Sequence, residues 1–179
     1  SPSGLDMSVP GAIGQLGGLL AEDPERNRQI AADISAALAD GRKCLVLSRR
    51  RDHLTELAAL LPEAEALIMR GGTGAKALAA IRARIADTSI GDPLLVMTTV
   101  PYGGEGFDAP IIDTVFLAGP ISFPGLVIQA VGRALRRHEG KKEVVVHDYV
   151  DPVVPVLRAQ YARRRSAYQQ MGFTECGQR

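Results

Sequence analysis

Two arginines, a glycine and a glutamine recur at helical spacing between positions 129 and 136 of this 179-residue chain. Each residue of an α-helix advances by about 100°, so these four side chains share one face roughly 100° wide. They are Gln129, Gly132, Arg133 and Arg136. The opposite face carries Val127, Ile128, Ala130, Val131, Ala134 and Leu135. The spacing predicts a helix that buries its apolar side and presents the four polar positions outward.

Phosphate recognition is the chemistry that suits this outward face. A guanidinium offers a rigid fork of donors that matches phosphate oxygens and keeps its charge. Gly132 would let another surface approach closely, and Gln129 could hold a water molecule or a phosphate oxygen. An ordinary polar face of an amphipathic helix also fits the spacing. Such a face usually carries acids as well, whereas Asp113 is the only acid between Asp108 and Glu139.

A second candidate site follows the apolar run at 94–97, where Thr98 and Thr99 precede a glycine-rich loop that ends in Gly106 and Asp108. Glycines expose backbone N–H groups that can cradle an oxyanion, and a carboxylate could accept from a ribose hydroxyl. Loops of this kind also occur in dinucleotide and methyl-donor sites and as plain tight turns. The loop alone is therefore a weak signal.

Together the two segments resemble motifs of the superfamily 2 helicases. Residues 129–136 match motif VI, Gln-x-x-Gly-Arg-x-x-Arg, at every fixed position, and residues 95–108 are similar to motif V. The resemblance implies that Arg136 is an arginine finger and Arg133 its partner, both reaching the γ-phosphate of ATP across an interdomain cleft. It assigns the ATP site further residues: Gly106 by the γ-phosphate, Asp108 by the ribose, and Gln129 and Gly132 on the same surface.

The resemblance also implies a nucleic-acid contact. Ser48 and Arg49 follow an apolar run as in motif IV, and Thr98 or Thr99 would touch a backbone phosphate. The turn around Gly72 fails the spacing of a Walker A loop, and we interpret it as exposed N–H groups facing the nucleic-acid backbone. The arginines after Ser48 also fit a solvated start of a helix. His53, within that helix, is predicted to lie on its surface.

Two motifs are missing from the sequence: a Walker A loop and an Asp-Glu box after a strand. We therefore expect ATP with Mg²⁺ to be held mainly by an N-terminal RecA-like domain of the same protein, and this chain alone to be inactive. The resemblance covers residues 25–150. It includes DEAD/DEAH-like and type III restriction-subunit-like helicases, although the 98–108 loop is longer than in DEAD-box proteins.

Helix and strand patterns alternate along the chain. Asp23-Pro24 is a typical helix start, and Gly41 a typical end. The predicted strands are Cys44–Leu47, Ala66–Met69, Leu94–Met97, Thr114–Leu117 and Val144–His147. The later predicted helices are Asp52–Leu61, Ala75–Ala86, Pro124–Arg137 and Val153–Gln170. Short apolar strands interleaved with helices predict an α/β fold with a mostly parallel sheet buried on both faces. With the resemblance, this becomes a RecA-like three-layer domain of five or six strands.

Three regions are expected: a linker or leader at 1–20, the RecA-like domain at 21–152, and a C-terminal helix and tail at 153–179. The net charge of +1 provides no strong global field. Cys44 is predicted to be a small buried hydrophobe, Cys176 lies in the tail, and no metal-ligand spacing occurs. No apolar run is long enough to span a bilayer, and no signal peptide is visible, so a cytoplasmic location is expected.

The function expected from the sequence is the second motor domain of an ATP-dependent helicase or translocase that contacts a DNA or RNA backbone. Two alternatives stay open. A freestanding Rossmann-type nucleotide-binding domain would use the loop at 103–108. A non-enzymatic module would bind nucleic acid or protein through the clustered arginines alone.

Overall fold

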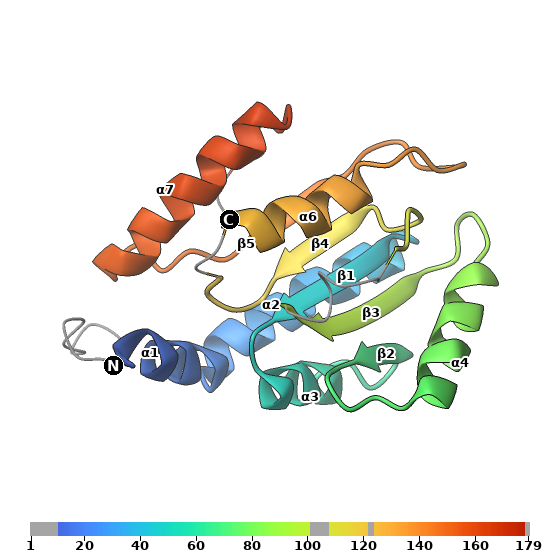
Figure 1. Ribbon diagram of the computed structural model, residues 1–179, viewed down its shortest axis with the longest axis horizontal. Coiled ribbons are helices and arrows are strands. Elements are labelled where there is room, and N and C mark those ends of the chain that lie inside the picture. The colour runs from blue at the N-terminus through green and yellow to red at the C-terminus, as the bar shows by residue number, and fades with distance from the viewer. Residues whose placement is uncertain (1–10, 101–107, 122–123, 178–179) are drawn as a thin grey trace.

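The computed structural model describes residues 11–100, 108–121 and 124–177 (Figure 1). Five strands form one sheet in the order β2-β3-β1-β4-β5, and every pairing is parallel. They are β1 (Lys43–Ser48), β2 (Ala66–Met69), β3 (Leu94–Thr99), β4 (Thr114–Leu117) and β5 (Val145–Asp148). The prediction of a parallel α/β sheet is confirmed.

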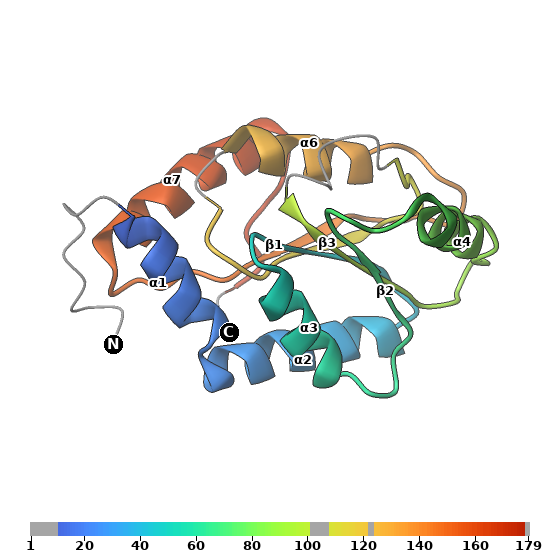
Figure 2. The same cartoon turned by 60° about the horizontal axis from the view of Figure 1, so that its bottom comes forward.

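Helices cover both faces of the sheet (Figure 2). On one face α2 (Pro24–Ala39) and α3 (Arg51–Ala59) pack with Cys44 and Val46 of β1. On the other face α4 (Ala75–Ala86) and α6 (Pro124–Ala134) pack with Leu45 and Leu47. Alternate residues of β1 thus enter two separate cores, because successive side chains of a strand point to opposite faces. This is the three-layer arrangement predicted.

Burial differs between central and edge strands. Every residue of β1, β3 and β4 is buried, as the unbroken apolar runs predict. The edge strands β2 and β5 are only partly buried, because each has a neighbour on one side alone. The sheet also extends further than the apolar runs, since Ser48 pairs with Thr99 at the end of the β1–β3 ladder.

The predicted start and end of α2 are confirmed. The Asp23 carboxylate accepts from the backbone N–H groups of Glu25 at 3.0 Å and Arg26 at 3.1 Å. This occupies two N–H groups that have no partner within the helix. After the helix, Gly41 takes a left-handed φ of 71°, a conformation that glycine adopts without a steric penalty.

The linker prediction for residues 1–20 is wrong for its second half. Helix α1 (Ala12–Ala21) occupies that stretch, and residues 1–10 lie outside the described part. Leu16 and Leu20, one helical turn apart, are buried against Val154 and Leu157 at the start of α7 (Pro155–Gln170). The glycines of this stretch obscured a helix that tertiary packing stabilises. Among the described residues, no helix has the length and apolar character that a membrane span requires.

Candidate functional site

Helix α6 faces the sheet with the side that the sequence predicted. Val127, Ala130, Val131 and Ala134 are buried, whereas Gln129 is exposed and Gly132 and Arg133 are half-buried. Two further residues were expected on the buried side, and that expectation is wrong. Ile128 is 39% and Leu135 41% exposed, because both lie at the edge of the buried arc, where the sheet no longer covers them.

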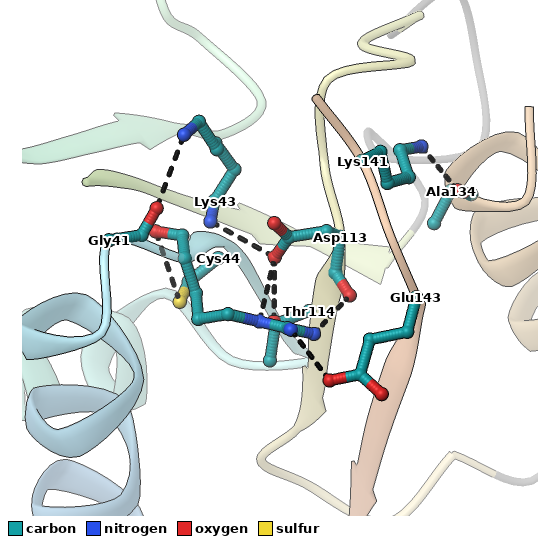
Figure 3. A network of polar contacts seen from close by, with 9 residues as sticks. Gly41, Lys43, Cys44, Asp113, Thr114, Ala134, Lys141 and Glu143 are labelled. Atoms are coloured by element: carbon teal, nitrogen blue, oxygen red, sulfur yellow. Dashed lines mark hydrogen bonds and ion pairs between the residues drawn. The ribbon is translucent and has the colours of Figure 1, made fainter. Parts of the chain in front are cut away.

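The helix also ends earlier than predicted, at Ala134, so Arg136 lies in the turn that follows. The backbone N–H of Arg136 donates to the carbonyl of Arg133 at 3.1 Å. The Lys141 ammonium donates to the carbonyls of Ala134 at 2.6 Å and Arg136 at 2.8 Å (Figure 3 shows the Ala134 contact). Partial burial lowers the pKa of Lys141, and the charge of Asp113 opposes that shift.

Arg136 and Asp108 contact each other, although they come from the two separate motifs. Arg136 Nη1 donates to Asp108 Oδ2 at 2.6 Å. Both side chains remain about half exposed, at 56% and 54%. The guanidinium is therefore accessible from solvent and is not packed inside against the sheet. Gly106, assigned to the same site, lies outside the described residues.

Gly132 has open space beside it. A methyl group built on its α-carbon would have no heavy atom of the described residues within 4 Å, apart from its own helix and immediate neighbours. Packing within the described part of the domain therefore does not require a glycine at position 132. The open space leaves room for a surface that approaches α6 from outside.

The predicted nucleic-acid residues lie at the carboxyl ends of β1, β2 and β3, but not all of them are on the surface. Arg49 and Gly72 are exposed. The side chains of Ser48, Thr98 and Thr99 are buried, at 1%, 0% and 7% exposure. The expected contact of these three residues with nucleic acid stays a prediction, and in this structure their side chains lie inside the domain. Their hydroxyls lie inside because the β1–β3 ladder extends through them.

Two of the exposed turns approach each other. A methyl group on Gly71 would lie 2.9 Å from Arg51 Nη2, so the guanidinium of Arg51 rests on the backbone of the β2–α4 turn. That turn is closed by hydrogen bonds between Arg70 and Thr73 in both directions, at 2.9 and 3.1 Å. The arginines after β1 and the glycines after β2 therefore form one polar surface.

His53 is buried at 1% exposure, so the prediction of a surface residue is wrong. Its Nδ1 lies 3.0 Å from Ser48 Oγ and its Nε2 lies 2.9 Å from Asn27 Oδ1. Asn27 Nδ2 donates to the Ala21 carbonyl, which leaves Asn27 Oδ1 to accept from His53 Nε2–H. His53 Nδ1 then accepts from the Ser48 hydroxyl, and Ser48 Oγ accepts from the N–H of Arg50 at 3.2 Å.

This chain of hydrogen bonds suits a neutral imidazole. Burial, with the charges of Arg26 and Arg50, lowers the pKa of His53 to about 4. The network supports the turn that carries the arginines after β1, and it gives Ser48 a structural role. The sequence did not reveal this network, because Asn27 is 26 positions away from His53 along the chain.

The candidate residues fall into two groups at opposite ends of α6. Because α6 returns antiparallel to the strands, it begins near their carboxyl ends and finishes near their amino ends (Figure 1). An 11-residue helix spans about 16 Å. Arg136 and Asp108 are therefore at the other end of α6 from the turns after β1 and β2.

A polar network joins the amino ends of the central strands (Figure 3). The Asp113 carboxylate accepts from the backbone N–H of Lys43 at 3.1 Å and from the Thr114 hydroxyl at 2.8 Å. Arg42 contacts the same carboxylate at 3.2 Å and the carboxylate of Glu143 at 3.0 Å. β1, β4 and the segment before β5 are thereby joined.

Residues 27–138 match the family model of the helicase conserved C-terminal domain. The chain belongs to this family. The match covers more than half of the domain, from α2 to just beyond Arg136. It includes the whole of the outward face of α6. No curated protein sequence matches this helicase C-terminal domain.

Solved structures share the fold. T4 UvsW superposes with a TM-score of 0.70 at 18% identity, covering 94% of this chain and 36% of its own. Domain 2 of the DEAD-box helicase Mss116p, bound to an RNA duplex, gives 0.61 at 18% identity, covering 81% and 57%. The C-terminal part of the Fun30 ATPase domain gives 0.59 at 18% identity, covering 70% and 40%. The fold is therefore RecA-like, as in domain 2 of superfamily 2 helicases, and the chain spans less than two thirds of each of these structures.

Proposed function

We propose that this helicase C-terminal domain is the second motor domain of an ATP-dependent nucleic-acid helicase or translocase. In this proposal Arg136 and Arg133 act on the γ-phosphate of ATP held by a first RecA-like domain of the same protein. The observation that carries the proposal is the outward face of α6. It presents Gln129, Gly132 and Arg133, with Arg136 half exposed beyond them, inside the segment that matches the family model.

Phosphoryl transfer is the chemistry that this face can assist. Negative charge on the transferring group is stabilised by guanidinium groups, and an arginine finger contributes roughly 10³- to 10⁵-fold in rate. Mg²⁺ would be bound with the nucleotide on the first domain, where it neutralises phosphate charge. Arg136 already binds a carboxylate, that of Asp108, which supports binding of an oxyanion at this position. When the cleft closes, phosphate would replace Asp108 as its partner, and Asp108 would become available to a ribose hydroxyl.

The surface formed by the turns after β1 and β2 is the proposed contact for the nucleic-acid backbone. Arg49 and Arg51 are exposed there, and Gly72 has a left-handed φ of 92° with open space around it. Arginine and free N–H groups bind phosphate without reading base sequence. Binding should therefore weaken steeply as salt rises. The RNA duplex bound to domain 2 of Mss116p supports a contact of this kind.

The test uses the full-length protein that contains this domain, with single-stranded DNA and RNA compared as activators. Arg136→Ala and Arg133→Ala should each lower the kcat of nucleic-acid-stimulated ATP hydrolysis, Arg136→Ala by at least about 10²-fold. The Kd for nucleic acid should stay within about twofold, because neither residue lies on the proposed nucleic-acid surface. Arg137→Ala is the matched control, since Arg137 is the exposed neighbour outside the motif.

Two results would favour the alternatives. An unchanged kcat in Arg136→Ala would point to a non-enzymatic binding module. Submillimolar affinity of the isolated chain for ATP in calorimetry would point to a freestanding nucleotide-binding domain. A hollow of about 690 Å³ lies between α2 and the α3–β2 loop, and no predicted ATP-site residue of the described part lines it.

A further inference from the structure

Lys141 bridges two carbonyls of the turn that carries Arg136. Its Nζ donates to Ala134 O at 2.6 Å and to Arg136 O at 2.8 Å. The last carbonyls of a helix lack partners within the helix, and a cation there also favours the negative end of the helix dipole. One ammonium group therefore caps α6 and fixes the main chain of Arg136, two residues beyond the last helical residue.

The segment around Lys141 is itself attached to the sheet. Gly140 has a φ of 79° and lies so close to Ile90 that an added methyl group would be 2.8 Å from Ile90 Cγ2. Glu143 pairs with Arg42 at 3.0 Å. The N–H of Val145 donates to the carbonyl preceding β4 at 2.9 Å. Lys141 thus links Arg136 to the amino ends of the strands, and not only to its own helix.

Arg136 is consequently held at both ends. Lys141 holds its carbonyl, and Asp108 holds its guanidinium at 2.6 Å. When phosphate replaces Asp108, the contact between Lys141 and the Arg136 carbonyl still remains. A long, flexible arginine side chain reaches a defined point only if its α-carbon is fixed, and small misplacements of a catalytic group are costly in rate.

We propose that Lys141 is a positioning residue for Arg136: its bridge between the Ala134 and Arg136 carbonyls sets the direction in which the arginine finger leaves the domain. The inference rests on the proposed function, because it gives Lys141 a role only if Arg136 acts on ATP. Lys141 touches neither substrate nor metal in this proposal. It acts through the backbone of the finger.

The experiment compares Lys141→Met with Lys142→Met in the full-length protein. Methionine keeps an unbranched apolar stem of similar length and removes the donors. Lys142 is the exposed neighbour in the sequence. Lys141→Met should lower the kcat of nucleic-acid-stimulated ATP hydrolysis by about tenfold, as expected for a misplaced group. The nucleic-acid Kd should stay within twofold, and Lys142→Met should leave both unchanged. Lys141→Arg, which can still donate to two carbonyls, should recover most of the rate.

A second arm separates positioning from a general loss of structure. In the Arg136→Ala background, Lys141→Met should lower kcat no further, because the group that it positions is absent. Three results would each overturn the inference. One is a further tenfold loss of kcat in the Arg136→Ala background. The others are a kcat of the single variant Lys141→Met equal to that of Lys142→Met, and no recovery of kcat in Lys141→Arg. If Arg136→Ala itself leaves kcat unchanged, the proposed function fails. A large effect of Arg136→Ala with a silent Lys141→Met defeats only the role of Lys141.

Discussion

Arg136 and Asp108 form an ion pair across 2.6 Å, 28 positions apart in the chain. Both residues were assigned to ATP, one to its γ-phosphate and the other to its ribose. Their pairing means that the proposed finger has an internal partner when no nucleotide lies between the domains. In the proposed function, the energy of this pair decides how easily phosphate can replace the carboxylate.

We expect the pair to be weak. Both side chains are about half exposed, and solvent screens exposed ion pairs to about 1 kcal/mol or less. A double-mutant cycle of Asp108→Ala and Arg136→Ala, followed by urea unfolding, should give a coupling energy in that range that shrinks at high salt. A salt-independent coupling of several kcal/mol would instead make the pair a structural element of the domain.

Gly132→Ala should separate stability from function. Alanine is favoured over glycine inside a helix by about 1 kcal/mol, and the position has open space in this chain. The variant domain should therefore unfold at equal or higher urea concentration. In the full-length protein the added methyl group should lower ATPase activity, if the first domain approaches α6 as closely as proposed. Equal or raised activity would show that no surface comes near Gly132.

The buried His53 should make stability depend on pH. Its pKa is about 4 in the folded domain, against 6.5 ordinarily, so the unfolded chain binds more protons between these values. The free energy of unfolding then falls as pH decreases from 6.5 to 4, by up to about 3 kcal/mol for this one group. Above pH 6.5 the contribution of His53 is complete.

Carboxylates also titrate in that range, so the comparison is with His53→Gln. Glutamine can still reach Asn27 but cannot become charged. The variant should be less stable at pH 7, and its loss of stability between pH 6.5 and 4 should be smaller than that of the wild type. Parallel pH profiles of the two proteins would contradict the assignment of this slope to His53.

Helix α7 should depend on one buried ion pair. The Arg164 guanidinium contacts both carboxylate oxygens of Asp148 at 2.7 and 2.8 Å, and both side chains are below 10% exposed. Removing one partner of such a pair leaves a buried charge and costs about 3–5 kcal/mol. Asp148→Asn should lower the free energy of unfolding by a large part of that amount. Glu175→Gln, which weakens the exposed pair with Arg165, is the control and should cost about 1 kcal/mol or less.

Local patterns were enough to predict most elements of this domain. The bounds of β2, α4 and β4 agree with the apolar runs to the residue. Each run is short and continuous or repeats at helical spacing, and turn-forming residues such as Pro62 and Gly74 interrupt the pattern. The outward face of α6 followed from the angle between successive residues of a helix. Such features depend on neighbours in the chain, which a sequence shows directly.

Tertiary structure decided which polar side chains are buried. His53 and Arg164 are polar residues of helices, and the sequence does not show the partners that allow them to be buried. Asn27 and Asp148 supply those partners from other elements, and a buried polar group is stable only when it is paired. The end of α6 has the same explanation, since Lys141 lies seven residues beyond the carbonyl that it caps. The sequence by itself determined the strands, most of the helices and the motif spacing. Helix α1, the end of α6 and the direction of Arg136 were decided by contacts that form only after the chain has folded.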